Sequence, residues 1–107
     1  MTIRQTEIFG ALADPTRRAI FERLCRDGEQ TVWMLTDRAK VSQPMVSKHL
    51  NVLKASGLVR HRRDGRETRY SARPEGLEPL ADWMEVYVTF WRAKFDLLED
   101  LLKRMDQ

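Results

Sequence analysis

Cysteine is almost absent from this chain of 107 residues, and other familiar features are missing altogether. Cys25 is the single cysteine, so no disulfide can form within the chain, which agrees with a reducing compartment. No apolar run approaches the ~20 residues that a membrane-spanning helix needs, and the first residues lack the basic-then-apolar order of a signal peptide. We therefore expect a cytoplasmic protein that does not enter a membrane.

The sequence also lacks the residues that metal sites and common catalytic centres require. A zinc-type site needs about four Cys, His or carboxylate donors held close together. This chain has one Cys and two His, far apart in sequence. It contains neither a phosphate-binding Gly-rich loop nor a nucleophile elbow. We expect no metal, no cofactor and no enzymatic activity.

What is present fits one globular domain whose positive charge is unevenly distributed. Hydrophobic residues make up 42% of the chain and charged residues 33%, and the length is that of a single domain over residues 1–107. Residues 41–73 carry eight cations against two anions, whereas residues 74–107 carry four cations against eight anions. The middle third is therefore where a polyanion such as DNA would bind.

A helix bounded at both ends lies in this positive third. Ser42 is an N-cap type residue, Pro44 suits the first turn, and Gly57 suits the left-handed position at which a helix stops. The predicted helix, within residues 41–57, has an apolar face that includes His49, for which packing is the favoured role. Its opposite face is free of acids, and such a face fits a DNA major groove, about 12 Å wide.

The preceding residues predict three helices and one short extended segment. A helix over residues 3–13 is followed by a second that begins at Asp14 and Pro15 and ends at residues 26–28. Cys25 in this second helix is expected to be a buried small residue rather than a sensor thiol. After an extended segment at residues 29–32, a helix over residues 32–40 and a short turn complete a helix-turn-helix.

Residues 58–72 predict a β-hairpin rich in arginine. Asp64-Gly65 is a strong hairpin signal, and the residues on either side alternate with period two. A cationic hairpin behind a recognition-type helix is typical of a wing that lies along the DNA backbone or minor groove. The alternative is a solvated edge whose charges prevent aggregation.

Residues 75–105 predict one long helix with apolar residues on two stripes. A helix that packs on one small domain needs an apolar stripe only about 100° wide, so the second stripe needs a separate partner. A second copy of the chain is the simplest partner. We expect a homodimer whose interface includes Ile8 of the first helix and, from the terminal helix, Leu80, Trp83, Met84, Tyr87, Phe90, Trp91, Leu98 and Leu101.

With these elements, the chain resembles the ArsR/SmtB-like winged-helix transcriptional repressors over nearly its full length. Three stretches carry the resemblance: ALADPTRRAIFERL at residues 11–24, VSQPMVSKHLNVLKASGLV at residues 41–59 and RRDGRETRYS at residues 62–71. The resemblance implies a homodimer that binds an imperfect palindrome near a promoter and is released by a signal. The metal-sensing members carry a Cys-x-Cys pair at the positions of Thr31 and Trp33 and histidines in the terminal helix, so this chain is more similar to a metal-free branch with an unassigned inducer.

The expected fold is mostly α-helical with a small hairpin, in the order α-α-(β)-α-α-β-β-α. The expected function is sequence-specific binding of double-stranded DNA by a homodimeric regulator, a repressor or autorepressor. The alternatives are a protein-interaction module and a redox-responsive repressor that acts through Cys25. The predicted DNA contacts come from the recognition helix and the wing: Gln43, Pro44, Ser47, Lys48, Asn51, Lys54, Arg62, Arg63, Arg66 and Arg69.

Overall fold

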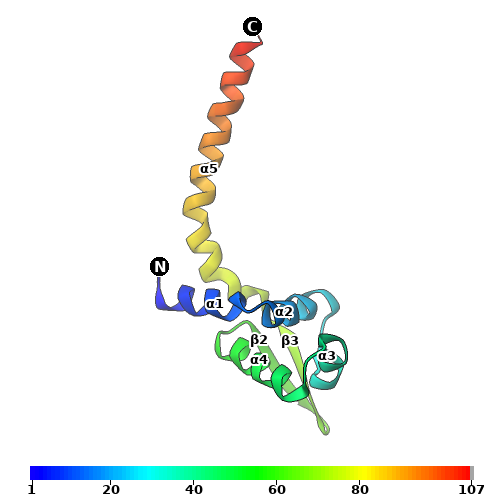
Figure 1. The fold of residues 1–107 in the computed structure, drawn as a ribbon. Coiled ribbons are helices and arrows are strands. Elements are labelled where there is room, and N and C mark those ends of the chain that lie inside the picture. Colours follow the sequence, from blue (N-terminus) through cyan, green and yellow to red (C-terminus); the bar gives the residue numbers. More distant parts are fainter. Residues whose placement is uncertain (107) are drawn as a thin grey trace.

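Five α-helices, a three-stranded antiparallel sheet and one 3-10 turn make up residues 1–106, the part of the chain that the computed structural model describes (Figure 1). This order confirms the predicted fold class. The elements are α1 (Ile3–Ala13), α2 (Pro15–Asp27), β1 (Gln30–Thr31), α3 (Val32–Ala39), α4 (Gln43–Ala55), β2 (Val59–Asp64), β3 (Glu67–Ala72), η1 (Pro74–Leu77) and α5 (Glu78–Met105).

The helix ends lie where the capping residues predicted them. The Asp14 side chain accepts a hydrogen bond from the backbone N–H of Arg17 at 2.9 Å and starts α2. The Ser42 hydroxyl accepts one from the backbone N–H of Met45 at 3.3 Å and starts α4. Such bonds satisfy amide groups that the first turn of a helix leaves free. After α4, Gly57 has a φ of 77°, a left-handed conformation that costs glycine little.

The sheet has the strand order β1-β3-β2, so the hairpin is extended on one side by the short strand before α3. In the hairpin, Asp64 is the register partner of Glu67, which leaves Gly65 and Arg66 as the two turn residues. Gly65 has a φ of 65°. A glycine with positive φ at the first turn position matches the right-handed twist of a hairpin. Arg66 is thereby placed at the tip.

The core lies between α1, α2, α3, α4 and the base of the hairpin. Val46, Leu50 and Leu53 of α4 are completely buried, as the apolar face of the recognition helix predicted. They pack in one cluster with residues of α1, α2, α3, β2 and β3, among them Leu24 and Leu35. The buried face fixes α4 and turns its opposite face to solvent. We call residues 3–77 the winged-helix unit.

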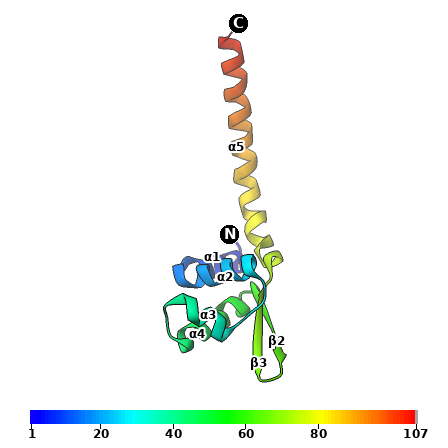
Figure 2. The same ribbon diagram turned by 90° about the vertical axis from the view of Figure 1, so that its right-hand side faces the viewer.

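Helix α5 leaves the winged-helix unit and projects away from it (Figures 1 and 2). The radius of gyration is 19.2 Å, whereas a compact chain of this length would have about 13 Å. From Met84 to Asp106 every residue is exposed. The expectation that one apolar stripe packs on the chain's own domain is therefore wrong beyond the first turns, where Gln5 donates a hydrogen bond to the carbonyl of Pro79 at 3.1 Å.

Two boundaries differ from the sequence prediction. Helix α5 starts at Glu78, since Pro74–Leu77 forms a 3-10 turn instead of the first helical turn. The recognition helix occupies Gln43–Ala55 within the predicted residues 41–57. Both differences lie at helix ends, where capping geometry and the fixed φ of proline compete with α-helical propensity.

Candidate nucleic-acid interface

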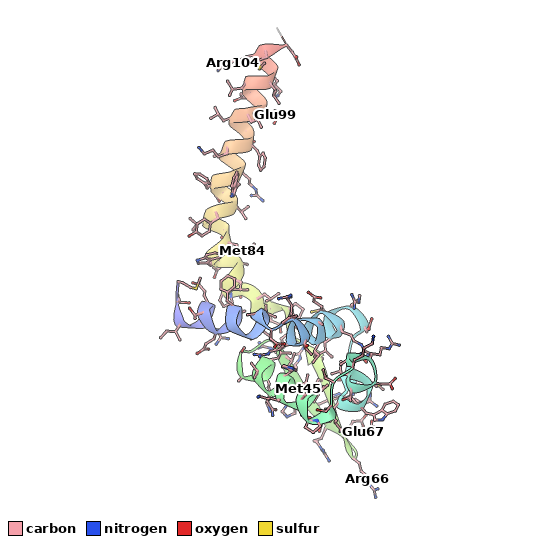
Figure 3. The ribbon with its side chains drawn as sticks, in the orientation of Figure 1. Met45, Arg66, Glu67, Met84, Glu99 and Arg104 are labelled. Atoms are coloured by element: carbon pink, nitrogen blue, oxygen red, sulfur yellow. The ribbon has the colours of Figure 1, made fainter. Side chains whose placement is uncertain are left out.

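One face of α4 gathers the candidate base contacts. Gln43, Pro44, Lys48 and Asn51 are exposed, and Ser47 is half-buried. Figure 3 shows this end of the molecule, with Met45 of α4 and the hairpin tip on the same side, away from α5. Since α4 carries no acidic residue, amide, hydroxyl and ammonium groups can meet a polyanion there without like-charge repulsion. Lys54, also exposed, lies in the last turn of α4.

The turn between α3 and α4 sets the position of the recognition helix. Helix α3 packs against α4, and Leu35 of α3 is buried between them and the rest of the core. Lys40 ends α3 with a φ of 58°, a left-handed conformation that is uncommon for a residue other than glycine. The chain then extends through Ser42 into α4. This is helix-turn-helix geometry, with α3 as the bracing helix.

The hairpin extends from α4 with Arg66 at its tip (Figure 3). Arg66 is exposed and makes no ion pair with any residue of the described range 1–106. Arg63 is also exposed, and its guanidinium donates to the hydroxyl of Thr68 at 3.2 Å and to the carbonyl of Gly65 at 3.3 Å. Both of these partners are neutral, so Arg63 and Arg66 keep their full charge for a phosphate.

The other two wing arginines are already paired with carboxylates. Arg69 lies 2.8 Å from Asp64 and 3.4 Å from Glu67. Arg62 donates two hydrogen bonds to Glu29, at 2.9 and 2.7 Å. The four predicted wing contacts therefore divide into two free arginines and two neutralised ones.

The pair between Glu29 and Arg62 joins the start of β1 to the wing. The two hydrogen bonds from the Arg62 guanidinium hold the pKa of the Glu29 carboxyl below its ordinary value, and the same bonds raise the pKa of Arg62. A bidentate pair of this kind fixes orientation as well as charge. Glu29 was not among the predicted site residues, and a separation of 33 residues left no local signal for it.

Arg60 is a further cation of the hairpin that was not among the predicted DNA contacts. It is exposed, and it faces Ser71 across the hairpin, on the same side of the strands as the register pair Arg62 and Arg69. Because side chains alternate between the two faces of a strand, the sequence could have predicted that Arg60 shares a face of β2 with Arg62.

His49 lies inside the unit and not at its surface. It is buried on the inner face of α4, and its Nε2 atom lies 4.0 Å from a carboxylate oxygen of Asp14. The pKa of Asp14 is lowered, first by the hydrogen bond from the Arg17 amide and then by the nearby charges of His49 and Arg17. This placement agrees with the predicted packing role.

Cys25 corrects one sequence prediction. It is exposed on α2 and not buried as predicted, because α2 directs Ile20, Phe21 and Leu24 into the core instead. Desolvation nevertheless raises the pKa of the Cys25 thiol, and the charge of Glu22 raises it further. A raised pKa lowers the fraction of reactive thiolate, which disfavours Cys25 as a redox sensor.

Apolar side chains of α5 form a second candidate surface. We call this surface, from Met84 to Met105, the α5 face; its large exposed members are Met84, Val86, Tyr87, Val88, Phe90, Trp91, Phe95, Leu97, Leu98, Leu101, Leu102 and Met105. Phe90 and Trp91 contact each other edge to face at 5.9 Å between ring centroids. Such a continuous apolar surface is unusual on a protein that acts as a monomer.

Three predicted interface residues lie at or below the base of this surface. Ile8 is a correction: it has 0% exposure within the chain's own core and offers nothing to a partner. Trp83 and Leu80 are half-buried, and Trp83 contacts Phe9 of α1 edge to face at 5.2 Å. The helical period of α1 indicated that Ile8 is buried but did not distinguish a partner from the chain's own core.

Metal donors do not gather within residues 1–106: no three His, Cys, Asp or Glu side chains there could hold an ion together. No helix of the described chain is long and apolar enough to cross a membrane.

Comparisons with known proteins all find helix-turn-helix domains or regulators of transcription. A family model described as a helix-turn-helix domain matches residues 12–62. The transcriptional repressor SdpR of Bacillus subtilis is 34% identical over 72% of this chain and 84% of its own length. An ArsR-like transcriptional regulator from Rhodococcus sp. RHA1 has a solved structure with 34% identity, a TM-score of 0.72 and 92% of both chains covered.

A solution structure of a protein from Mycobacterium bovis is also similar, and that protein is a homodimer. It is 27% identical, with a TM-score of 0.64, and covers 80% of this chain and 79% of that one. It is described as a homodimeric winged helix-turn-helix DNA-binding domain and a possible ArsR-family transcriptional regulator.

Proposed function

Because the chain belongs to the ArsR-like family of winged helix-turn-helix transcriptional regulators, we propose that it binds DNA as a homodimer and represses transcription. The observation that carries this proposal is the exposed, acid-free face of α4 beside a cationic hairpin, with a buried face that holds α4 in place. The homologous proteins are regulators of transcription, and we propose no catalytic role for this one. It would act in the cytoplasm, where it meets DNA.

In this proposal, α4 enters the major groove and contacts base edges. Gln43 and Asn51 supply amides, which pair well with adenine, and Lys48 supplies an ammonium group, which suits guanine. Ser47 can contact a base or a phosphate, and Pro44 packs against the groove wall. Lys54 is in the last turn, about 16 Å along the helix from Gln43, where it suits the phosphate backbone.

The wing contacts the backbone or the adjacent minor groove. Arg63 and Arg66 are the main contributors, because their charges are not neutralised by carboxylates. Arg62 and Arg69 contribute less, because Glu29, Asp64 and Glu67 already satisfy them.

The homodimer forms through the α5 face of two chains. Two copies then place two α4 helices on one side of the DNA, and a two-fold axis between them requires an imperfect palindrome as the operator. The half-sites lie one helical turn, about 34 Å, or a multiple of it apart. The net positive middle third faces the DNA, while the net negative final third is held away from it.

The test is a mobility shift with duplex DNA from the region upstream of the protein's own gene. We expect retardation of this duplex at lower protein concentration than an unrelated duplex, and none of single-stranded RNA. Binding to neither duplex would contradict the proposal and favour a protein-interaction module. Equal binding to both would contradict sequence-specific repression.

A further inference from the structure

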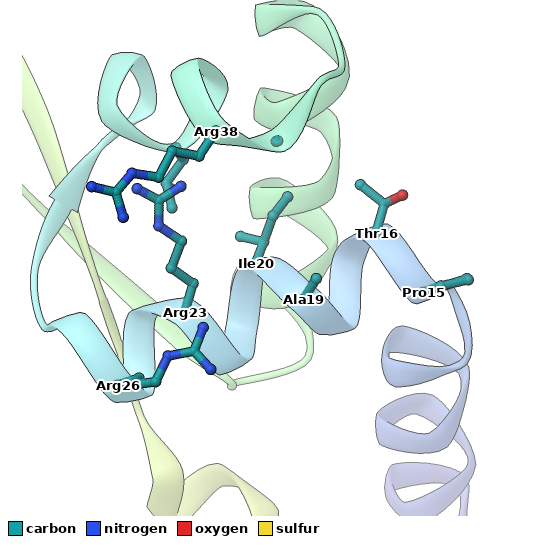
Figure 4. Close-up of a pocket in the computed structure, with 9 residues that line it drawn as sticks. Pro15, Thr16, Ala19, Ile20, Arg23, Arg26 and Arg38 are labelled. Carbon is teal, nitrogen blue, oxygen red and sulfur yellow. The ribbon is translucent and has the colours of Figure 1, made fainter.

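A cavity of about 370 Å³ opens between α2 and α3, on the side of the winged-helix unit where α3 leads into α4 (Figure 4). Its floor is apolar, because the side chains of Ile20, Leu35 and Ala39 line it. Ile20 and Leu35 are only 3% and 1% exposed. The accessible apolar surface therefore comes from Ala39, which is half-buried, and from Pro15 and Ala19, which are exposed. The volume lies in the range of about 300–1,000 Å³ that is usual for small-molecule sites.

Three arginines line the same cavity, and they have little negative charge to balance them. Figure 4 shows Arg23 rising from α2 toward α3, and Arg38 extending from α3 over the same opening. Arg26 lies one turn beyond Arg23 on α2. Asp27 is the only carboxylate paired with this group in the described residues, 3.6 Å from the Nε of Arg23 and 4.0 Å from that of Arg26.

Arg23 is held in place but is not satisfied. Its side chain is only 14% exposed, and its Nε atom is buried without a hydrogen-bond partner. Its Nη2 atom donates to Gln30 at 3.5 Å, the limit of a hydrogen bond. Arg38 has no ion pair within residues 1–106. A buried, incompletely bonded guanidinium is costly unless an acceptor completes it.

We infer that this cavity binds a small organic anion with an apolar body and that this ligand controls DNA binding. Its carboxylate or phosphate group lies between Arg23 and Arg38, since the fork of an arginine fits two oxygen atoms of such a group. Its apolar body lies on Pro15, Ala19 and Ala39. The apolar floor is the reason to expect an organic anion and not an inorganic one.

The site bears on regulation because its two arginines belong to different helices. An anion that bridges Arg23 of α2 and Arg38 of α3 fixes the angle between these helices. Arg38 lies two residues before Lys40, whose left-handed turn directs the chain into α4. The ligand therefore changes the position of the recognition helix. This regulatory step rests on the proposed function, whereas binding of the anion does not.

The DNA backbone is another source of an anionic oxygen. A phosphate of the DNA would occupy Arg38 only while DNA is bound, and it would make no use of the apolar floor. Comparison of a carboxylate with its uncharged amide, in the absence of DNA, distinguishes the two sources.

The binding experiment uses benzoate as the probe and benzamide as the neutral control, at constant ionic strength. Titrations are followed through the backbone amide signals of the full-length protein by NMR. We expect benzoate to shift signals of α2 and α3 and benzamide to bind at least tenfold more weakly. Arg38→Gln and Arg23→Gln should each weaken benzoate binding tenfold or more, whereas Arg104→Gln, at the far end of α5, should not change it.

Equal shifts with benzamide, or unchanged benzoate affinity in Arg38→Gln, would overturn the site. Arg38 is exposed, so its replacement leaves the core intact even if Arg23→Gln disturbs folding. If Arg38→Gln instead weakens DNA binding without benzoate and lowers its salt dependence, the arginine is a phosphate contact and the inference is wrong.

The regulatory step is tested by the upstream-duplex mobility shift with and without saturating benzoate. We expect at least a threefold change in affinity for the wild type and no change for Arg38→Gln. Benzoate binding without any effect on a functional DNA complex would overturn the regulatory step alone. Failure to bind DNA even without benzoate would overturn the proposed function and leave the anion site standing.

Discussion

The winged-helix unit and α5 use apolar residues in opposite ways. In the unit, the apolar faces of α1 to α4 close on one core, and side chains such as Leu50 have no exposure at all. In α5, which has 28 residues and is about 42 Å long, no side chain is buried. Helical periodicity is clear in both regions. A periodic apolar face therefore shows that one side of a helix is to be buried. It does not show whether the same chain or a partner chain buries it.

The winged-helix unit and α5 also differ in charge. The exposed surface of the unit gathers cations on α4 and the hairpin, whereas residues 74–107 have a net negative charge. One end of the molecule is therefore suited to DNA and the other to a second copy of the chain. Changes at the α5 end should affect both assembly and DNA binding, and changes at the other end only DNA binding.

The largest effect is expected from charges placed on the α5 face. Phe90→Glu together with Leu98→Glu would bury two unpaired carboxylates in a dimer, which costs several kcal/mol each and should raise the dissociation constant at least 10⁴-fold. Both residues project from α5 beyond its contact with α1, unlike Trp83, which packs on Phe9. Sedimentation velocity should show monomers, and the upstream duplex should no longer be retarded.

Trp33→Glu is the control for this double change, because Trp33 is exposed and apolar but lies on α3. It should leave the dimer intact. An unchanged dimer in the α5 double variant would show that the two regions do not differ as proposed.

The next effect concerns stability, and it contrasts two leucines. Leu50→Ala opens a cavity in the core and should lower the free energy of unfolding by about 2–5 kcal/mol. Leu98→Ala removes a surface side chain of the monomer, for which a change within about 0.5 kcal/mol is usual. Urea unfolding at protein concentrations above and below the dimer dissociation constant distinguishes the two effects.

The loss from Leu50→Ala should be the same at both protein concentrations. The loss from Leu98→Ala should appear only at the higher concentration, at which the dimer forms. A large loss from Leu98→Ala in the dilute monomer would mean that α5 folds back onto its own unit.

Much of the winged-helix unit could be predicted because its determinants are local. Asp14, Ser42 and Gly57 mark helix ends through their own backbone geometry, and the period of α4 identifies its buried face. Features that depend on residues far apart in the sequence could not be predicted. Glu29 reaches Arg62 across 33 residues, and whether Ile8 contacts the core or a partner depends on how α1 is placed.

A smaller effect is expected from the recognition helix. Gln43→Ala removes an amide from the exposed start of α4 and should cost about 1–3 kcal/mol of binding free energy on the operator, with little change on unrelated duplex. The dimer should be unaffected, because Gln43 is remote from α5. Titrations of both duplexes with the same preparation provide the measurement. Equal losses on both duplexes would remove Gln43 from the base-contacting set.

The smallest effect distinguishes the free wing arginines from the neutralised ones. Each phosphate contact contributes about one to the slope of log affinity against log salt. Arg66→Ala should therefore lower this slope by about one, and Arg62→Ala by less, because Glu29 competes with the DNA for Arg62. Glu29→Gln should free Arg62 and strengthen binding, and this gain should vanish in the double variant Glu29→Gln with Arg62→Ala.

The same competition predicts how binding responds to pH. The pKa of Glu29 is lowered in the folded protein, so its pair with Arg62 is complete above the ordinary glutamate pKa of about 4.3 and is lost only as pH falls through the lowered value. Between about pH 6 and 8 the pair persists, and the slope difference between Arg62→Ala and Arg66→Ala should not change. Identical slopes for the two variants would mean that phosphate displaces Glu29 completely, and that the ion pair orients the wing without weakening it.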